Sequence, residues 1–203
     1  MKKIIILIFI VIVVPLILQA KDTVVLIAYY SAQGHTKAMA RAVADGVSST
    51  DGVVVKLQTI QETKTEDILE VDAIIVGTPV YNANVAPQVQ KFINSWPFKD
   101  APLKDKIGAA FTTAGGISAG EESVMLSILR SMLIYNMIIV GGPDWQSAFG
   151  ASAIVDEAPF DKIGKETKVS EQFLEKGRAL GKRVALLVKE IKPVEHKNRS
   201  SNE

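Results

Sequence analysis

The sequence predicts an α/β domain in which helices cover both faces of a parallel β-sheet. Short, continuous apolar runs such as residues 23–28 are typical of strands that are buried on both faces. These runs alternate along the chain with segments of helical periodicity, and parallel strands require such crossover helices. A length of 203 residues suits one domain of this class.

The apolar pattern places the elements in order. We predict strands at residues 23–28, 52–57, 73–77, 106–111 and 137–140. We predict helices at residues 36–47, 88–96, 121–136 and 169–190, and a short polar helix or turn at residues 65–69. In the first helix Met39, Val43 and Val47 share one face, and the long helix at 121–136 begins with two acids that suit its positive end. The domain then covers residues 21–191, and residues 192–203 form a polar tail.

Residues 1–20 are set apart from this domain by their composition. Lys2 and Lys3 precede an apolar run at residues 4–18 that only Pro15 interrupts. A basic start followed by a short apolar stretch is typical of a secretory signal peptide. An uncleaved membrane anchor and a buried core helix are the alternatives. The two lysines favour an exported or membrane-anchored domain, and an inverted anchor would leave the domain in the cytoplasm.

The overall composition excludes several classes of function. The 23 Lys and Arg residues nearly balance 22 Asp and Glu residues, so nothing in the charge indicates a nucleic-acid partner. The absence of cysteine excludes disulfides, thiolate metal sites and cysteine nucleophiles. With only two histidines, a histidine-based metal centre is not expected.

Loops rich in small and polar residues follow three of the predicted strands, at residues 31–36, 77–84 and 112–120. Ligands of parallel sheets lie outside the carboxyl ends of the strands. The first loop reads Ser-x-x-Gly-x-Thr before a helix, which is typical of a phosphate site or of an ordinary strand–helix turn. It lacks the Walker A lysine and the three glycines of the dinucleotide fingerprint. Together the three loops favour a mononucleotide with a planar ring, such as a flavin.

Five motifs occur in the order that one family shows. They are Tyr-Tyr-Ser-Ala-Gln-Gly-His-Thr-Lys-Ala-Met-Ala at residues 29–40, Gly-Thr-Pro-Val-Tyr-Asn at 77–82, Phe-Thr-Thr-Ala-Gly-Gly at 111–116, Gly-Glu-Glu at 120–122 and Phe-Gly-Ala-Ser-Ala-Ile at 149–154. On these motifs, residues 23 to about 190 resemble the flavodoxin-fold FMN proteins. More narrowly, they resemble the WrbA-type NAD(P)H:quinone oxidoreductases and the NADPH-dependent FMN reductases.

The resemblance implies a flavodoxin-like three-layer sandwich with a five-stranded parallel sheet. It also implies FMN as the cofactor, NAD(P)H as the electron donor, a quinone or other small molecule as the acceptor, and a homo-oligomer. The residues implied for the FMN phosphate are Ser31, Ala32, Gln33, Gly34, His35 and Thr36. Those implied for the isoalloxazine and the ribityl chain are Pro79, Val80, Tyr81, Asn82, Thr112, Thr113, Ala114, Gly115 and Gly116.

Two aromatic residues are implied for the substrate pocket. Trp96 falls near a tryptophan that the family places there, and its alternative is a core aromatic at a helix end. Tyr135 stands where the family commonly has a histidine near the flavin. His35 also has an alternative, as a solvated residue in the first turn of a helix. No catalytic side chain is expected, since the flavin carries the hydride chemistry.

Three functions fit these features. The first is an FMN-dependent oxidoreductase, and the second is a flavodoxin-like carrier that docks on a protein redox partner. The third is a binding module that has lost its cofactor. Carriers are usually strongly acidic around the flavin, whereas this chain is nearly neutral, which favours the enzyme. The glycines of the first and third loops favour a bound cofactor over the third function.

Overall fold

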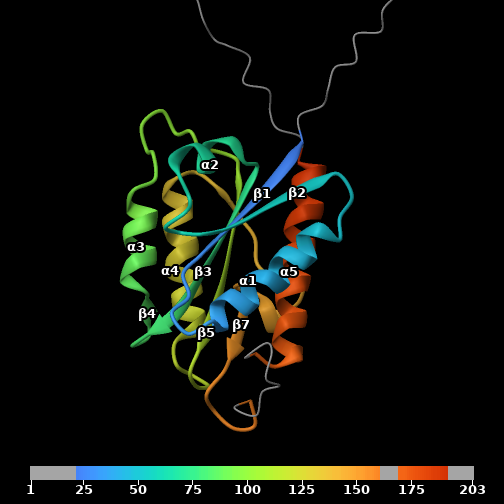
Figure 1. The fold of residues 1–203 in the computed structure, drawn as a ribbon. Helices are drawn as coiled ribbons and strands as arrows, with labels where there is room; N and C mark the ends of the chain where they lie inside the picture. The colour runs from blue at the N-terminus through green and yellow to red at the C-terminus, as the bar shows by residue number, and fades with distance from the viewer. Residues whose placement is uncertain (1–21, 161–168, 192–203) are drawn as a thin grey trace, which may run out of the picture.

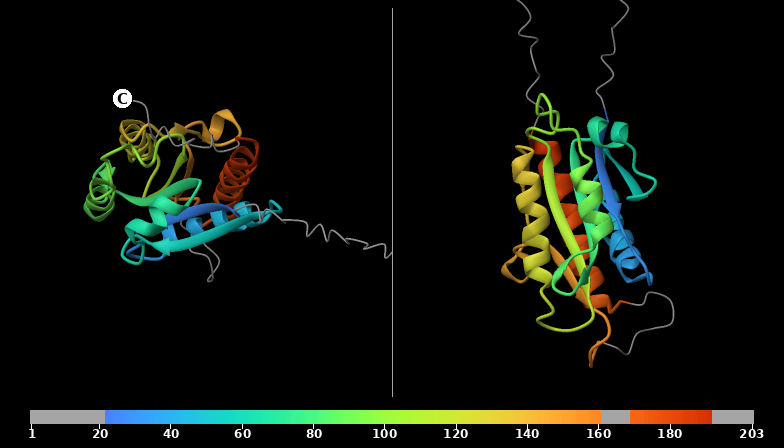
Figure 2. Two further views of the ribbon diagram at one scale, coloured as in Figure 1. Left: turned by 90° about the horizontal axis from the view of Figure 1, so that it is seen from above. Right: turned by 90° about the vertical axis from the view of Figure 1, so that its left-hand side faces the viewer.

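The computed structural model describes residues 22–160 and 169–191 and has three layers (Figure 1). A central sheet separates α1 (His35–Ser48) and α5 (Glu171–Glu190) from the helices of the other face. That second face is covered by α2 (Thr65–Glu70), α3 (Pro87–Asn94) and α4 (Glu121–Ile134), as the two turned views show (Figure 2). The predicted α/β class with a parallel sheet is therefore confirmed.

Five positions across the sheet are filled by parallel strands. The order is β2 (Val53–Thr59), β1 (Thr23–Tyr29), β3 (Ala73–Tyr81), β5 (Ile107–Ala114) and β6 (Ile138–Ile139). Because β1, β3 and β5 lie in the middle of the sheet, successive side chains of each strand point toward opposite helical layers. In β1, Val25 and Ile27 join the core under α1 and α5, while Leu26 and Ala28 join the core under α2, α3 and α4.

The fifth position of the sheet differs from the prediction. The strand predicted at residues 137–140 is present as the shorter β6, which pairs with the start of β5, and a second strand, β7 (Ala151–Ile154), pairs with the end of β5. Gly141, Gly142 and Pro143 interrupt the strand, and a loop with a short 3-10 helix, η1 (Trp145–Ser147), intervenes before β7. A two-residue strand, β4 (Asn84–Val85), also pairs antiparallel with the end of β3.

Helix α3 begins one residue earlier than predicted and ends before Trp96. Pro87 occupies the first turn, where its missing N–H costs nothing, and Ser95 closes the helix. The strands β1, β2, β3 and β5 run one to four residues beyond their predicted ends, toward the loops of the candidate site.

The predicted signal or anchor at residues 1–20 and the predicted tail at residues 192–203 lie outside the described residues. In the two described ranges, no helix combines the length and apolarity that a membrane span requires. The same ranges contain no group of three or more His, Asp and Glu side chains placed to hold a metal ion.

Candidate functional site

The candidate site lies at the carboxyl ends of β1, β3 and β5. These three strands are neighbours in the sheet, so the loops that follow them meet at one edge. Eight residues from the three loops and strand ends line a pocket of about 110 Å³ between them: Ser31, Ala32, Gln33, His35, Thr36, Pro79, Tyr81 and Thr113. The fold thus brings together all of the predicted phosphate residues except Gly34 with residues predicted for the flavin ring.

The loop after β1 presents backbone donors at the start of α1. Gly34 caps the helix with a φ of +98°, a conformation that side chains other than glycine rarely adopt. The Ser31 hydroxyl accepts hydrogen bonds from the N–H groups of Gly34 (3.1 Å) and Lys37 (3.2 Å), which holds the loop closed. Among the described residues, nothing accepts a hydrogen bond from the N–H groups of His35 and Thr36.

The electrostatics of this helix start favour an anion. The positive end of the helix dipole acts here, and no acidic side chain occupies the first turn of α1. His35 is half-buried and lines the pocket, so it is not simply an exposed surface residue. The open N–H groups and the uncompensated dipole fit a phosphate at this position.

A buried pair of hydroxyls ties this helix to β5. Thr36 Oγ1 lies 2.8 Å from Thr113 Oγ1, and both side chains are almost completely buried. A hydroxyl–hydroxyl hydrogen bond uses one of the two protons, so the other proton is available to a ligand in the pocket. The adjacent Thr112 points to the opposite face, where its buried hydroxyl has no partner among the described residues. Thr112, also predicted for the flavin, does not line the pocket.

The end of β3 turns sharply into β4 beside the pocket. Asn82 and Ala83 have φ values of +49° and +58°, the left-handed pair of a tight hairpin turn. Thr78 braces this turn, since its hydroxyl accepts a hydrogen bond from the Ala86 N–H (3.2 Å) and donates one to the Pro79 carbonyl (2.9 Å). An open groove of about 490 Å³ continues from the pocket along this hairpin. It is lined by Val80, Tyr81, Asn82, Asn84, Val85 and Pro87.

Tyr81 belongs to both the pocket and the groove. Partial burial, together with the neighbouring Tyr30 phenol with which it shares a hydrogen bond, raises the pKa of Tyr81 above its ordinary value. The phenol is therefore neutral at physiological pH. A neutral aromatic ring with a hydroxyl at its edge suits contact with a planar, polar ligand.

The loop after β5 is held by residues that follow β7, a contact that the sequence did not predict. The Asp156 N–H donates to the Gly115 carbonyl (3.2 Å), and the Ile117 N–H donates to the Glu157 carboxylate (2.6 Å). Both acids follow β7, the strand missed from the sequence. Ala114 is buried at the end of β5, and Gly115 and Gly116 follow it at the edge of the site without lining the pocket.

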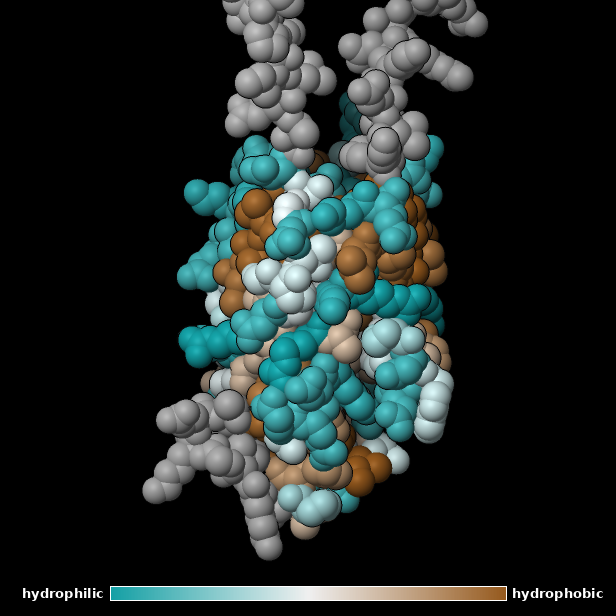
Figure 3. All heavy atoms as spheres, turned by 90° about the vertical axis from the view of Figure 1, so that its right-hand side faces the viewer, coloured by the Kyte–Doolittle hydropathy of each residue, from teal (hydrophilic) through white to brown (hydrophobic). Residues whose placement is uncertain are grey.

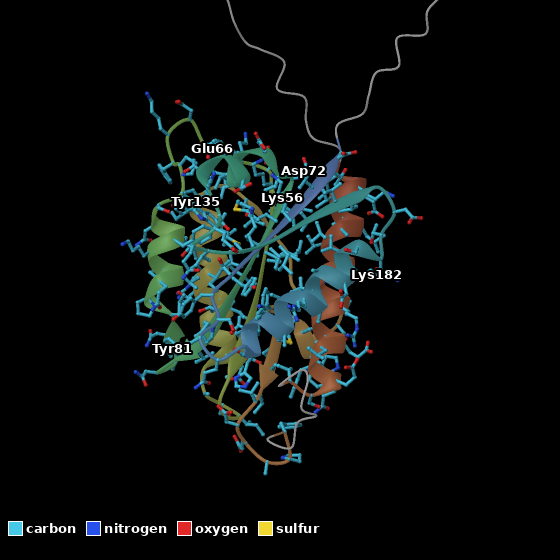
Figure 4. All side chains as sticks on the ribbon, in the orientation of Figure 1. Lys56, Glu66, Asp72, Tyr81, Tyr135 and Lys182 are labelled. Carbon is cyan, nitrogen blue, oxygen red and sulfur yellow. The ribbon has the colours of Figure 1, made fainter. Side chains whose placement is uncertain are left out.

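Trp96 and Tyr135 lie at the other end of the molecule. Helix α4 starts after the carboxyl end of β5, so its last residue and Tyr135 come to the amino ends of the strands, opposite Tyr81 (Figure 4). There Tyr135 contacts Trp96, with ring centroids 5.4 Å apart, and its hydroxyl donates to the Ile93 carbonyl (2.9 Å). Trp96 is buried, and burial raises the pKa of Tyr135. Within one chain the fold does not bring these two residues to the pocket.

Comparisons with known proteins agree with this architecture. Residues 26–129 match the family described as Flavodoxin domain. A flavodoxin of Clostridium saccharobutylicum is 30% identical over 167 residues, which cover 81% of this chain and 97% of that protein. An NAD(P)H dehydrogenase (quinone) of Azorhizobium caulinodans is 33% identical over 161 residues, which cover 67% of this chain and 79% of that protein.

Among solved structures, the flavodoxin, WrbA-like protein from Agrobacterium tumefaciens has a TM-score of 0.69 at 24% identity. That alignment covers 84% of this chain and 99% of the other, and at this identity it supports the fold alone. The match to the domain family, the similarity to the clostridial flavodoxin over most of both chains and the shared fold lead to one conclusion: this chain belongs to the flavodoxin family.

Proposed function

We propose that the chain binds FMN at this pocket and works as an oxidoreductase that passes electrons from NAD(P)H to a quinone or a similar small acceptor. One observation carries the proposal. The open N–H groups at the start of α1 share a pocket with Tyr81 and with the Thr36–Thr113 pair. An anion-binding helix end beside an aromatic wall matches a ligand with a terminal phosphate and a flat ring.

The chain's own groups have distinct tasks in this proposal. The N–H groups of His35 and Thr36, with one hydroxyl proton of the threonine pair, bind the phosphate. Ser31 keeps the loop in the shape that exposes these donors. Tyr81 borders the ring, and the groove along the hairpin leaves room beside it for a second molecule. The bound flavin would supply the hydride and electron transfer.

The relatives support two versions of this function. Proteins called NAD(P)H dehydrogenase (quinone) are about as similar to this chain as the clostridial flavodoxin is. The second candidate is therefore an electron carrier that docks on a protein partner. The net charge of +1 favours the enzyme, because a carrier of this fold usually presents an acidic surface to its partner.

Titration of the purified full chain with FMN tests the cofactor. We expect the visible absorbance of FMN to shift and its fluorescence to change, and riboflavin, which lacks the phosphate, to bind far more weakly. Thr36→Val should weaken FMN by about 1–3 kcal/mol, the cost of a lost hydrogen bond to a charged group. Thr50→Val is the matched control, because Thr50 is also buried but follows the far end of α1. Equal affinity for FMN and riboflavin would remove the phosphate site.

Steady-state kinetics then separate the enzyme from the carrier. The FMN-loaded chain should oxidise NADH or NADPH continuously when a water-soluble quinone is supplied. A carrier would hold electrons after chemical reduction but would not oxidise either nucleotide. A loaded chain that is inert to both nucleotides, yet is reoxidised by a partner protein, would favour the second candidate.

We also propose that residues 1–20 export the domain or anchor it in a membrane, and that the chain forms a homo-oligomer. The basic start and the apolar run at residues 4–18 support the location. Protease treatment of intact and of opened cells tests it. If the domain fractionates with the soluble cytoplasmic proteins, the export proposal fails. Sedimentation of the loaded chain measures the oligomer.

A further inference from the structure

Large apolar side chains are exposed at the end of the molecule opposite the candidate site. Phe98, Leu133 and Ile134 are 63%, 55% and 66% exposed. Leu133 and Ile134 end α4, and Phe98 lies in the loop that leads from α3 back to the start of β5. The Phe98 ring packs on Tyr135 (5.7 Å between centroids), which fixes its place beside the end of α4.

Other exposed apolar residues lie at the same end of the sheet. They are Val54 at the start of β2, Leu69 just before β3 and Ile191 at the end of α5. The Lys189 ammonium donates to the Asp51 carbonyl (2.7 Å), which holds the end of α5 against the start of β2. On the side formed by α1, α5 and β2, hydrophobic surface also gathers in the half of the molecule nearer this end (Figure 3).

The chain enters the domain at this same end. Strand β1 begins there with Thr23, and it lies two strands from β5, or roughly 10 Å across the sheet. Only residues 19–22 separate Thr23 from the apolar run at residues 4–18. The five Cα–Cα steps from Leu18 to Thr23 span at most about 18 Å. A membrane that holds the apolar run therefore lies next to this end of the domain.

We propose that the amino-end surface of the sheet, centred on Phe98, Leu133 and Ile134, rests on the lipid bilayer into which residues 4–18 insert. Large exposed apolar patches mark protein or membrane contacts, and here the short connection to an apolar segment indicates a membrane. Charges of both signs, including Lys99, Asp100 and Lys104, surround the patch. The contact is therefore apolar in origin and does not require anionic lipids.

This orientation has a consequence for the candidate site. The seven residues of β1 run from the membrane-facing end to the phosphate loop, a distance of roughly 23 Å. The pocket then opens to the aqueous phase, well away from the lipid surface. Its reaction partners must be water-soluble molecules or the exposed part of another protein.

The test uses two positions on one helix of the full chain. Because the chain has no cysteine, Leu133→Cys and Glu122→Cys each carry one thiol for an environment-sensitive fluorophore. Both positions are on the exposed surface of α4, eleven residues or roughly 16 Å apart along its axis. Each labelled chain is reconstituted into phosphatidylcholine vesicles, with and without lipids that carry a nitroxide on the acyl chain.

We expect the label at position 133 to shift to shorter wavelength and to lose most of its emission to the nitroxide lipids, while the label at position 122 is unaffected. Adding Phe98→Asp should restore emission at position 133 without changing the far-UV circular dichroism. Three outcomes would overturn the proposal: equal quenching at both positions, quenching at neither, and shielding of the label at position 133 by a second copy in the absence of lipid. So would removal of residues 1–20 from the native chain, detected by mass spectrometry. The proposal rests on the anchoring of residues 1–20 proposed above, but its readouts do not involve flavin, so the proposed FMN-dependent activity can stand or fail separately.

Discussion

The hydrogen bond between Thr36 and Thr113 makes a quantitative prediction about how the site is held together. It joins the start of α1 to the end of β5 across a sequence separation of 77 residues, and both hydroxyls are buried. Replacing either threonine with valine keeps the shape of the side chain but leaves the other hydroxyl without its partner. Each single change should lower the free energy of unfolding by about 1–3 kcal/mol, the usual cost of a buried polar group left unpaired.

The double variant should cost less than the sum of the two single variants. With both hydroxyls gone, no unpaired group remains, and the loss is only the net worth of the bond, about 0.5–1.5 kcal/mol. Residues in direct contact typically show coupling of this size, about 0.5–3 kcal/mol. The structure thus predicts that the costs at positions 36 and 113 are clearly less than additive.

Thr112→Val is the matched control for this comparison of single and double variants. Thr112 is the neighbour of Thr113 in the same strand and is completely buried, but its hydroxyl has no partner among the described residues. Removing it should leave stability unchanged or raise it slightly. Urea unfolding of the unchanged chain and the four variants without FMN, followed by circular dichroism, measures all these terms. If the two single costs simply add, or if Thr112→Val costs as much as Thr113→Val, the assigned geometry is wrong.

Further predictions concern single residues. Gly34→Ala should destabilise the folded chain by about 1–2 kcal/mol through its φ of +98° and weaken FMN, and a neutral result in calorimetry and titration would count against the strained cap. Tyr81→Ala should shift the absorbance and the potential of bound flavin, whereas Tyr81→Phe should preserve the absorbance; an unchanged spectrum in both would place the ring elsewhere. Tyr135→Phe should lower stability by about 1 kcal/mol, since its hydroxyl donates to the Ile93 carbonyl, and should leave FMN affinity unchanged. A large loss of FMN binding in that variant would contradict the position of Tyr135 at the far end.

The first loop could be predicted from sequence because its signals are local. An apolar strand, a short loop with Ser31 and Gly34, and an amphipathic helix follow one another within about 25 residues. Their order alone places the loop at the carboxyl end of β1. The long-range bond from Thr36 to Thr113 has no local signal, because nothing in either segment specifies which hydroxyl faces the other.

The fifth sheet position was predicted only in part: β6 lies within the strand predicted at residues 137–140, whereas β7 was missed. Strands β6 and β7 are two and four residues long, and neither has enough residues to show a period. They become strands because β5 offers them a free edge in two separate places. Because β7 is not recognisable from the sequence, the contacts by which Asp156 and Glu157 hold the loop after β5 could not be predicted either.

The position of Tyr135, by contrast, was open to topological reasoning. A crossover helix that starts at the carboxyl end of one parallel strand must return to the amino end before the next strand begins. Tyr135 ends such a helix, so the connection alone places it away from a pocket at the carboxyl ends. The resemblance to the family implies a substrate-pocket role for Tyr135, but it takes no account of the end of the sheet at which Tyr135 lies.

The proposed orientation of the domain on a membrane also limits which electron donor can reach the pocket. Pyridine nucleotides are plentiful inside cells and scarce outside, so an exported enzyme of this class would lack its expected donor. If the amino end rests on a membrane, the pocket lies roughly 23 Å from that surface, at the other end of β1. A quinone dissolved in the lipid cannot then reach it, and the compartment on that side of the membrane must supply both donor and acceptor in soluble form. The side of the membrane on which residues 1–20 place the domain therefore decides which electron donor the domain can use. A cytoplasmic domain is compatible with NAD(P)H, and an exported one requires a different soluble reductant or a redox protein, which is the carrier version of the function.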